Sequence, residues 1–144
     1  MAHKKRVLVV DDNESIVRVL EHVLTRAGYE VSTAFDGPEA VETALRVKPD
    51  LVLLDIEMPT MNGYEVCRRL RARRDLHNLH IIMLTVKGQL SPLGPTLADK
   101  KALEQRVREQ TDGFDAGADE FLTKPIVAKE VLAQVNRLLG SSGH

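Results

Sequence analysis

The sequence is poor in the residues on which several classes of protein depend. Its 144 residues include one cysteine, no tryptophan, three phenylalanines and two tyrosines. A single cysteine, Cys67, excludes an intramolecular disulfide and fits a reducing compartment. An aromatic content of 3% leaves few rings on which nucleic-acid bases could stack. These shortages argue against a disulfide framework and against a single-strand nucleic-acid binder.

Charge and hydropathy exclude further classes. The net charge of -1 predicts neither the basic field of a nucleic-acid binder nor an acidic tail. No apolar stretch approaches membrane-spanning length, and the first five residues lead into a strand instead of the apolar core of a signal peptide. With 43% hydrophobic residues, the chain suits one domain with a sizeable core. We therefore expect a cytoplasmic protein that contacts neither a membrane nor nucleic acid directly.

The chain is organised around an apolar run, residues 50–55, that ends on the carboxylate of Asp55. The run has the length of a strand, and Met58-Pro59 follows soon after it, which predicts a strand buried on both faces. Residues 6–10 repeat the arrangement and lead straight into Asp11 and Asp12. In open α/β sheets, ligands bind outside the carboxyl ends of the strands. If the two strands are neighbours, three carboxylates meet at one edge of the sheet.

Strands and helices alternate along the whole chain. Short apolar runs predict five strands, and apolar residues at helical spacing predict five helices. The expected strands are 6–10, 29–34, 50–55, 80–84 and 120–123, and the expected helices are 16–27, 38–45, 64–74, 98–110 and 127–139. Such alternation implies a five-stranded parallel sheet in a single doubly wound α/β domain, with helices on both faces. Glycines and prolines between residues 87 and 96 predict a loop before a mostly exposed helix.

The motifs at the strand ends resemble those of the receiver domain of two-component response regulators, the CheY-like family. The resemblance rests on one set of residues in a fixed order, and it covers nearly the whole chain: Asp11-Asp12, Asp55, Met58-Pro59, Gly63, Thr85 and Lys124-Pro125. It implies a flavodoxin-like sheet, which agrees with the pattern of strands and helices. We expect residues 5–140 to form the receiver domain and residues 141–144 a flexible C-terminal tail.

The residues themselves allow phosphoryl chemistry. A carboxylate can attack a phosphoryl group to give an acyl phosphate, so Asp55 is the candidate phosphoacceptor. Magnesium, a hard cation that takes oxygen ligands, would lie among Asp11, Asp12 and Asp55. Lys124 supplies a positive charge for the phosphoryl group, and the Thr85 hydroxyl can donate a hydrogen bond to one of its oxygens.

The resemblance adds details that the residues alone do not provide. It implies that the backbone carbonyl of Glu57 is a further Mg²⁺ ligand and that the peptide bond between Lys124 and Pro125 is cis. It also implies that Phe121 swings inward as Thr85 moves. From the residues alone, Phe121 is equally well explained as a strand residue packed in the core.

Each assignment has a simpler alternative. Asp11 and Asp12 could cap the first helix, since Asp is favoured at that position. Capping leaves Lys124 unexplained, so a phosphorylation site is the better interpretation. The arginines between residues 68 and 74 are best explained as a solvated helix end whose cations complement the helix dipole.

We therefore predict a phosphoacceptor switch and not an enzyme that acts on separate substrates. The expected partners are a sensor histidine kinase or phosphotransfer protein and a downstream protein target, with homodimer formation left open. A metal-dependent phosphatase is a weaker alternative, because the acid two residues beyond Asp55 is Glu57 and no substrate pocket is evident. The other alternative is an interaction module that is never phosphorylated.

One segment departs from the family pattern. The stretch between Thr85 and Gly117 exceeds the usual length by roughly fifteen residues, and loops of that size are usually functional or disordered. Our hypothesis is that residues 87–114 form an extended loop and helix that alters the partner surface or self-association.

Overall fold

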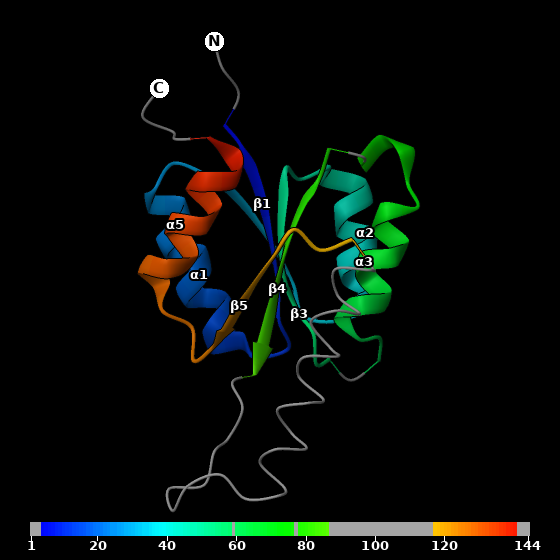
Figure 1. Ribbon diagram of the computed structural model, residues 1–144, viewed down its shortest axis with the longest axis horizontal. Coiled ribbons are helices and arrows are strands. Elements are labelled where there is room, and N and C mark those ends of the chain that lie inside the picture. The colour runs from blue at the N-terminus through cyan, green and yellow to red at the C-terminus, as the bar shows by residue number, and fades with distance from the viewer. Residues whose placement is uncertain (1–3, 59, 77, 87–116, 141–144) are drawn as a thin grey trace, which may run out of the picture.

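The protein is a parallel sheet covered on both faces by helices (Figure 1). The computed structural model describes residues 4–58, 60–76, 78–86 and 117–140. Its sheet has five strands in the order β2-β1-β3-β4-β5, which confirms the doubly wound receiver fold expected from the sequence. Helices α1 and α5 cover one face, and α2 and α3 cover the other. None of the helices among these residues is long and apolar enough to cross a membrane.

The elements follow the predicted order closely. Their bounds are β1 Arg6–Val10, α1 Glu14–Arg26, β2 Glu30–Ala34, α2 Gly37–Val47, β3 Leu51–Asp55, α3 Gly63–Arg71, a 3-10 helix Arg74–Leu76, β4 His80–Val86, β5 Glu120–Lys124 and α5 Ala128–Leu139. Strand β4 is longer than predicted, because Thr85 and Val86 pair with Thr123 and Lys124 of β5. Thr85 therefore belongs to the strand and does not follow it.

The connection from β4 to β5 is long, as the sequence predicts. β4 ends at Val86 and β5 begins at Glu120. The predicted loop at residues 87–96 and the predicted helix at residues 98–110 lie outside the described residues, as does the tail at 141–144. The hypothesis about residues 87–114 therefore stays a prediction.

Strand β3 is central because its residues are apolar on both sides. All five of its residues are buried, and it pairs with β1 on one side and β4 on the other. Val52 and Leu54 lie in the core beneath α2 and α3, whereas Leu51 and Leu53 lie in the core beneath α1 and α5. The alternation of side chains along a strand thus contributes to two cores at once. This packing fixes the positions of Asp11 and Asp55 at the strand ends.

Three of the described helices, α1, α2 and α3, begin with a side-chain cap. The Asn13 side chain accepts hydrogen bonds from the backbone N–H groups of Ser15 (3.0 Å) and Ile16 (3.2 Å) at the start of α1. Asp36 caps α2 and Asn62 caps α3 in the same way. The alternative that Asp11 and Asp12 cap the first helix is therefore wrong, because Asn13 already serves the orphan N–H groups.

Leu53→Ala should strongly destabilise the fold. Leu53 is fully buried, and removing a leucine side chain from a packed core costs about 3 kcal/mol in the free energy of unfolding. Urea denaturation followed by circular dichroism measures the change. Val19→Ala is the matched control: Val19 is 54% exposed, so its loss should change the free energy of unfolding by less than about 0.5 kcal/mol. Equal effects of the two substitutions would contradict this account of the core.

Candidate functional site

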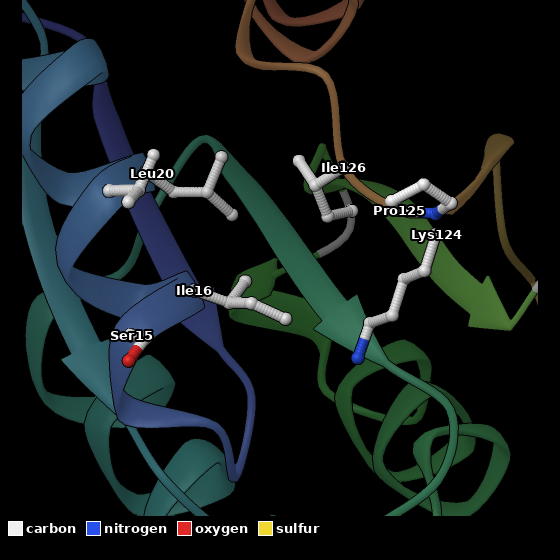
Figure 2. A pocket seen from close by; sticks show the side chains of 7 residues that line it. Ser15, Ile16, Leu20, Lys124, Pro125 and Ile126 are labelled. Atoms are coloured by element: carbon white, nitrogen blue, oxygen red, sulfur yellow. The ribbon is translucent and has the colours of Figure 1, made fainter.

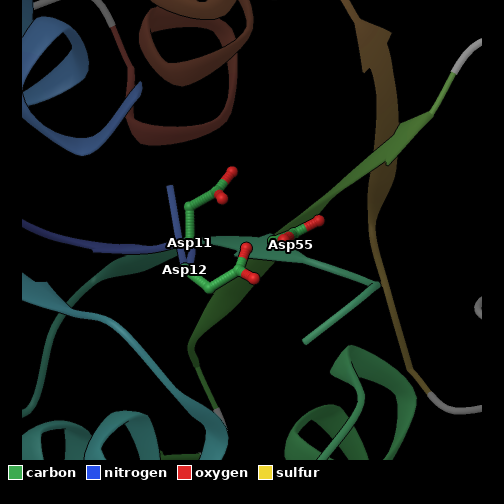
Figure 3. A group of neighbouring side chains, drawn as sticks. All are labelled: Asp11, Asp12 and Asp55. Atoms are coloured by element: carbon green, nitrogen blue, oxygen red, sulfur yellow. The ribbon is translucent and has the colours of Figure 1, made fainter. Parts of the chain in front are cut away.

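Three carboxylates meet where β1 and β3 end side by side (Figure 3). Asp11 and Asp12 follow β1 directly, and Asp55 is the last residue of β3. One oxygen atom from each of the three lies within 4.8 Å of the others. Asp11 and Asp55 are buried, with exposures of 0% and 2%, whereas Asp12 is exposed. The strand order thus brings together the three acids that the sequence predicted.

Lys124 reaches this acidic pocket from the edge of the sheet. It is the last residue of β5, and its Nζ lies 2.9 Å from Asp11 Oδ2 and 3.2 Å from Asp55 Oδ1. Figure 2 shows its side chain extending toward the end of β3. The Lys124–Pro125 peptide bond is cis, as the family resemblance implies. The structure therefore joins a lysine to two carboxylates that are far from it in the sequence.

The pocket holds more negative charge than one lysine offsets. Burial, followed by the charge of Asp11, raises the pKa of Asp55 to about 7, against the lowering effects of Lys124 and of the Glu57 N–H group. Burial alone would lower the pKa of Lys124, but the hydrogen bond to Asp11 and the charges of Asp55 and Asp11 outweigh it and raise that pKa. A proton or a further cation in this pocket would relieve the repulsion.

The acids fit a magnesium ion. Among the described residues, the buried Asp11 Oδ2 has the Lys124 ammonium group, 2.9 Å away, as its ion-pair partner and no other donor, so it retains capacity to bind a cation. Carboxylate oxygens are the ligands that Mg²⁺ prefers, and the exposed Asp12 leaves one side of the pocket open to water. The donor set therefore matches the metal that the sequence predicted.

The loop after β3 folds tightly back onto Asp55. Glu57 donates its backbone N–H to Asp55 Oδ1 at 3.3 Å, and Gly63 donates to the Ile56 carbonyl at 2.8 Å. A Cβ atom on Gly63 would lie 2.6 Å from the Asp55 carbonyl oxygen, which is too close for any side chain. Gly63 is thus required where α3 begins against the backbone of Asp55 and Ile56.

The two predicted switch residues lie near the pocket in different environments. Thr85 is buried and follows Leu84, the residue that pairs with Asp55 across β3 and β4. Phe121 is partly buried and packs against the core beneath α2 and α3. That placement agrees with Phe121 as a packed strand residue, and its movement with Thr85 stays a prediction.

An apolar groove lies beside Lys124, between α1 and the start of the segment that leads to α5 (Figure 2). Its lining residues are Ser15, Ile16, Val19, Leu20, Lys124, Pro125 and Ile126. The groove adjoins the acidic pocket through Lys124, which lines the first and contacts the acids of the second.

Comparison with known proteins identifies the family. The sequence pattern of the response regulator receiver domain matches residues 7–99. The chain belongs to the response regulator receiver domain family. It is 39% identical to the transcriptional regulatory protein PhoP of Bacillus subtilis over 138 residues, which are 96% of this chain and 50% of PhoP. It is 41% identical to the response regulator PleD of Caulobacter vibrioides over 133 residues, 92% of this chain and 26% of PleD.

Solved receiver structures have the same fold. The chemotaxis response regulator CheY4 of Vibrio cholerae superposes with a TM-score of 0.77 at 32% identity, covering 94% of this chain and 99% of CheY4. The chain spans half or less of the length of PhoP and PleD, yet nearly all of CheY4. A receiver domain is not a conventional enzyme, and an acidic triad such as this one is typical of a Mg²⁺-binding receiver site.

Sequence reasoning missed the roles of two residues, Asn13 beside the acids and Arg71 at the amino ends of β4 and β5. Asn13, next to two acids of the motif, caps α1, and its position just before a helical pattern was the available signal. Arg71 was grouped with the solvated arginines but is largely buried at the opposite edge of the sheet, where its guanidinium group binds backbone carbonyls. No local pattern distinguishes Arg71 from its neighbouring arginines.

The raised pKa of Asp55 predicts a pH-dependent stability. Between its ordinary value of 3.8 and about 7, the folded protein retains a proton that the unfolded chain releases. The stabilisation from Asp55 is therefore fully present below about pH 4 and is lost as the pH rises toward 7. In metal-free buffer, Asp55→Asn should exceed the wild type in free energy of unfolding by at least about 1 kcal/mol above pH 7.

Urea denaturation of both proteins between pH 4 and 8, with a chelator present, measures this difference. Added Mg²⁺ should stabilise the wild type above pH 7 and leave Asp55→Asn less affected, because the amide carries no charge. Parallel stability curves for the two proteins across the pH range would contradict the assignment.

Proposed function

We propose that this domain is a phosphoacceptor switch in which Asp55 receives a phosphoryl group from a phosphohistidine. The observation that carries the proposal is the position of Asp55: a buried carboxylate at a sheet edge, 3.2 Å from a lysine ammonium group and beside two further acids. Membership of the receiver family supports it, because the family implies a histidine kinase as the partner.

The proposed reaction is a transfer between two nucleophiles. A carboxylate oxygen of Asp55 attacks phosphorus, a P–O bond forms, the P–N bond to the histidine breaks, and the imidazole nitrogen leaves and takes up a proton. Lys124 holds a positive charge next to the attacking carboxylate, where it attracts the phosphoryl oxygens. Asp55 must be ionised to attack. Because its pKa is about 7, a neighbouring cation would increase the fraction of Asp55 that is ionised.

Asp11, Asp12 and Asp55 would hold a magnesium ion, together with the backbone carbonyl of Glu57. When bound, the metal would offset the negative charge of the acids and of the phosphoryl oxygens. This charge balance favours the ionised form of Asp55 and lets an anionic donor approach.

The output of the switch is a change in population between two states. The Thr85 hydroxyl and Lys124 would both contact a phosphoryl group on Asp55, and Phe121 would follow Thr85. Such contacts favour the phosphorylated state only by as much as they differ between the two states. We propose that the protein acts in the cytoplasm, and that its partners are a sensor histidine kinase or phosphotransfer protein and a downstream protein target.

Incubation with acetyl phosphate should add one phosphoryl group to the protein. Intact-protein mass spectrometry, with and without Mg²⁺, measures the gain, which should require Mg²⁺ and be absent in Asp55→Asn. Asp36→Asn is the matched control, because Asp36 is the cap of α2 and not one of the three clustered acids, and asparagine caps equally well. It should gain the group as the wild type does.

Failure of the folded wild type to gain mass with several donors would contradict the proposal. The domain would then be better described as an interaction module that works without phosphorylation. Gain of mass by Asp55→Asn at the wild-type rate would show that another residue is the acceptor.

A further inference from the structure

A second polar cluster lies at the amino ends of β4 and β5, whereas the acids lie at the carboxyl ends of β1 and β3. Arg71, at the C-terminal end of α3, donates Nε–H to the Gly117 carbonyl at 2.9 Å and also donates to the Leu79 carbonyl. Its Nη2 lies 2.7 Å from Asp119 Oδ2. One guanidinium group thus holds the chain just before β4 and the chain just before β5.

Asp119 continues the cluster into the sheet. Its Oδ2 accepts the Ile81 N–H at 2.8 Å, and its own N–H donates to the Ile81 carbonyl at 2.8 Å. Both backbone polar groups of one β4 residue are therefore bound by one residue at the start of β5. The next pair along the two strands is Ile82 with Glu120. The two hydrogen bonds between Asp119 and Ile81 therefore fix the register of β5 at its first residues.

The backbone approaches Arg71 closely at Gly117. Gly117 has a φ of +109°, and a Cβ there would lie 2.7 Å from Arg71 Cγ. The chain therefore turns into β5 against the stem of the arginine, as Figure 1 shows for the segment that passes from beside α3 into β5. A glycine at this position permits both the conformation and the contact.

The register of β5 depends on contacts outside the strand, because its own pattern of apolar residues is weak. The strand lies at the edge of the sheet, and its only apolar residues are Phe121 and Leu122. None of its residues is fully buried, in contrast to β3, where all five are. Register is poorly specified in a strand with few buried side chains.

Register decides where Lys124 lies. A shift of β5 by one residue moves every residue by about 3.3 Å along the strand and exchanges its two faces. Lys124 Nζ now lies 2.9 Å from Asp11 and 3.2 Å from Asp55, so such a shift would remove both contacts. We propose that Arg71, through Asp119, is a positioning residue that sets the register of β5 and so places Lys124 at the acidic pocket.

The catalytic consequence rests on the function proposed for Lys124, but the placement itself does not. The test therefore uses two measurements on the full chain. The first is the NMR resonance of the Lys124 ε-methylene group in the unphosphorylated protein, assigned by its loss in Lys124→Ala. The second is the rate of phosphorylation by acetyl phosphate with Mg²⁺.

Arg71→Gln and Asp119→Asn should both move the Lys124 resonance toward that of a solvated lysine. Both should slow phosphorylation by up to about a hundredfold, because a misplacement of about 1 Å at a reacting centre can cost that much in rate. Arg71→Lys should restore part of each signal, because lysine can pair with Asp119 but cannot bind both carbonyls in a fixed fork. It also serves as the test variant if Arg71→Gln does not fold.

Arg69→Gln is the matched control. Arg69 lies on the same helix and pairs with Glu65 of that helix at 3.0 Å, with no bond to β5 in the described residues. It should leave both measurements unchanged. A Lys124 resonance that stays in place in both Arg71→Gln and Asp119→Asn would overturn the inference, whatever the phosphorylation rates. If Arg71→Gln does not fold, Arg71→Lys takes its place in this comparison. If the wild type takes no phosphoryl group, the proposed function fails, and the resonance alone still decides the role of Arg71.

Discussion

The structure depends on one electrostatic imbalance: two buried carboxylates share one ammonium group. Asp11 and Asp55 are almost inaccessible to solvent, and Lys124 lies within 3.2 Å of both. Removing charges from water is costly, and pairing offsets that cost only in part. The pKa of Asp55, about 7, reflects the cost of burial and the repulsion by Asp11 that Lys124 does not offset. The site is therefore disposed to take up positive charge, which is the condition for holding a divalent cation.

The sheet keeps Asp11 and Asp55 close together because its central strands, β1 and β3, are tightly packed on both faces. β1 and β3 contribute alternate side chains to cores on both faces, so the residues at their ends have little freedom to move apart. The neighbouring helix starts are satisfied by Asn13, Asp36 and Asn62, and none of these caps competes for the acids. A fixed set of carboxylates preorganises the site, because no rearrangement is needed when charge arrives.

The acids of this site could be predicted from local sequence patterns, Lys124 only from the order of the family motif, and the role of Arg71 from neither. Asp55 and Asp11 follow continuous apolar runs, and such runs identify buried parallel strands whose carboxyl ends meet. Lys124 was found through the family motif, since its contacts span 69 residues and no local pattern encodes them. Arg71 was misassigned for the same reason: its partners Gly117 and Asp119 become neighbours only when β5 joins the sheet. The capping alternative failed because Asn13, beside the two acids, is the cap.

The acids and the lysine are therefore held by parts of the fold that differ in rigidity. The acids lie at the ends of fully or almost fully buried strands, whereas Lys124 ends an edge strand with no fully buried residue. Any change that reaches the pocket through the fold will displace the lysine more readily than the acids, because fewer packed side chains resist it. Since the charge of Lys124 lowers the pKa of Asp55, such a displacement also raises that pKa. The edge strand thus controls both the position of the Lys124 ammonium group and the ionisation of Asp55.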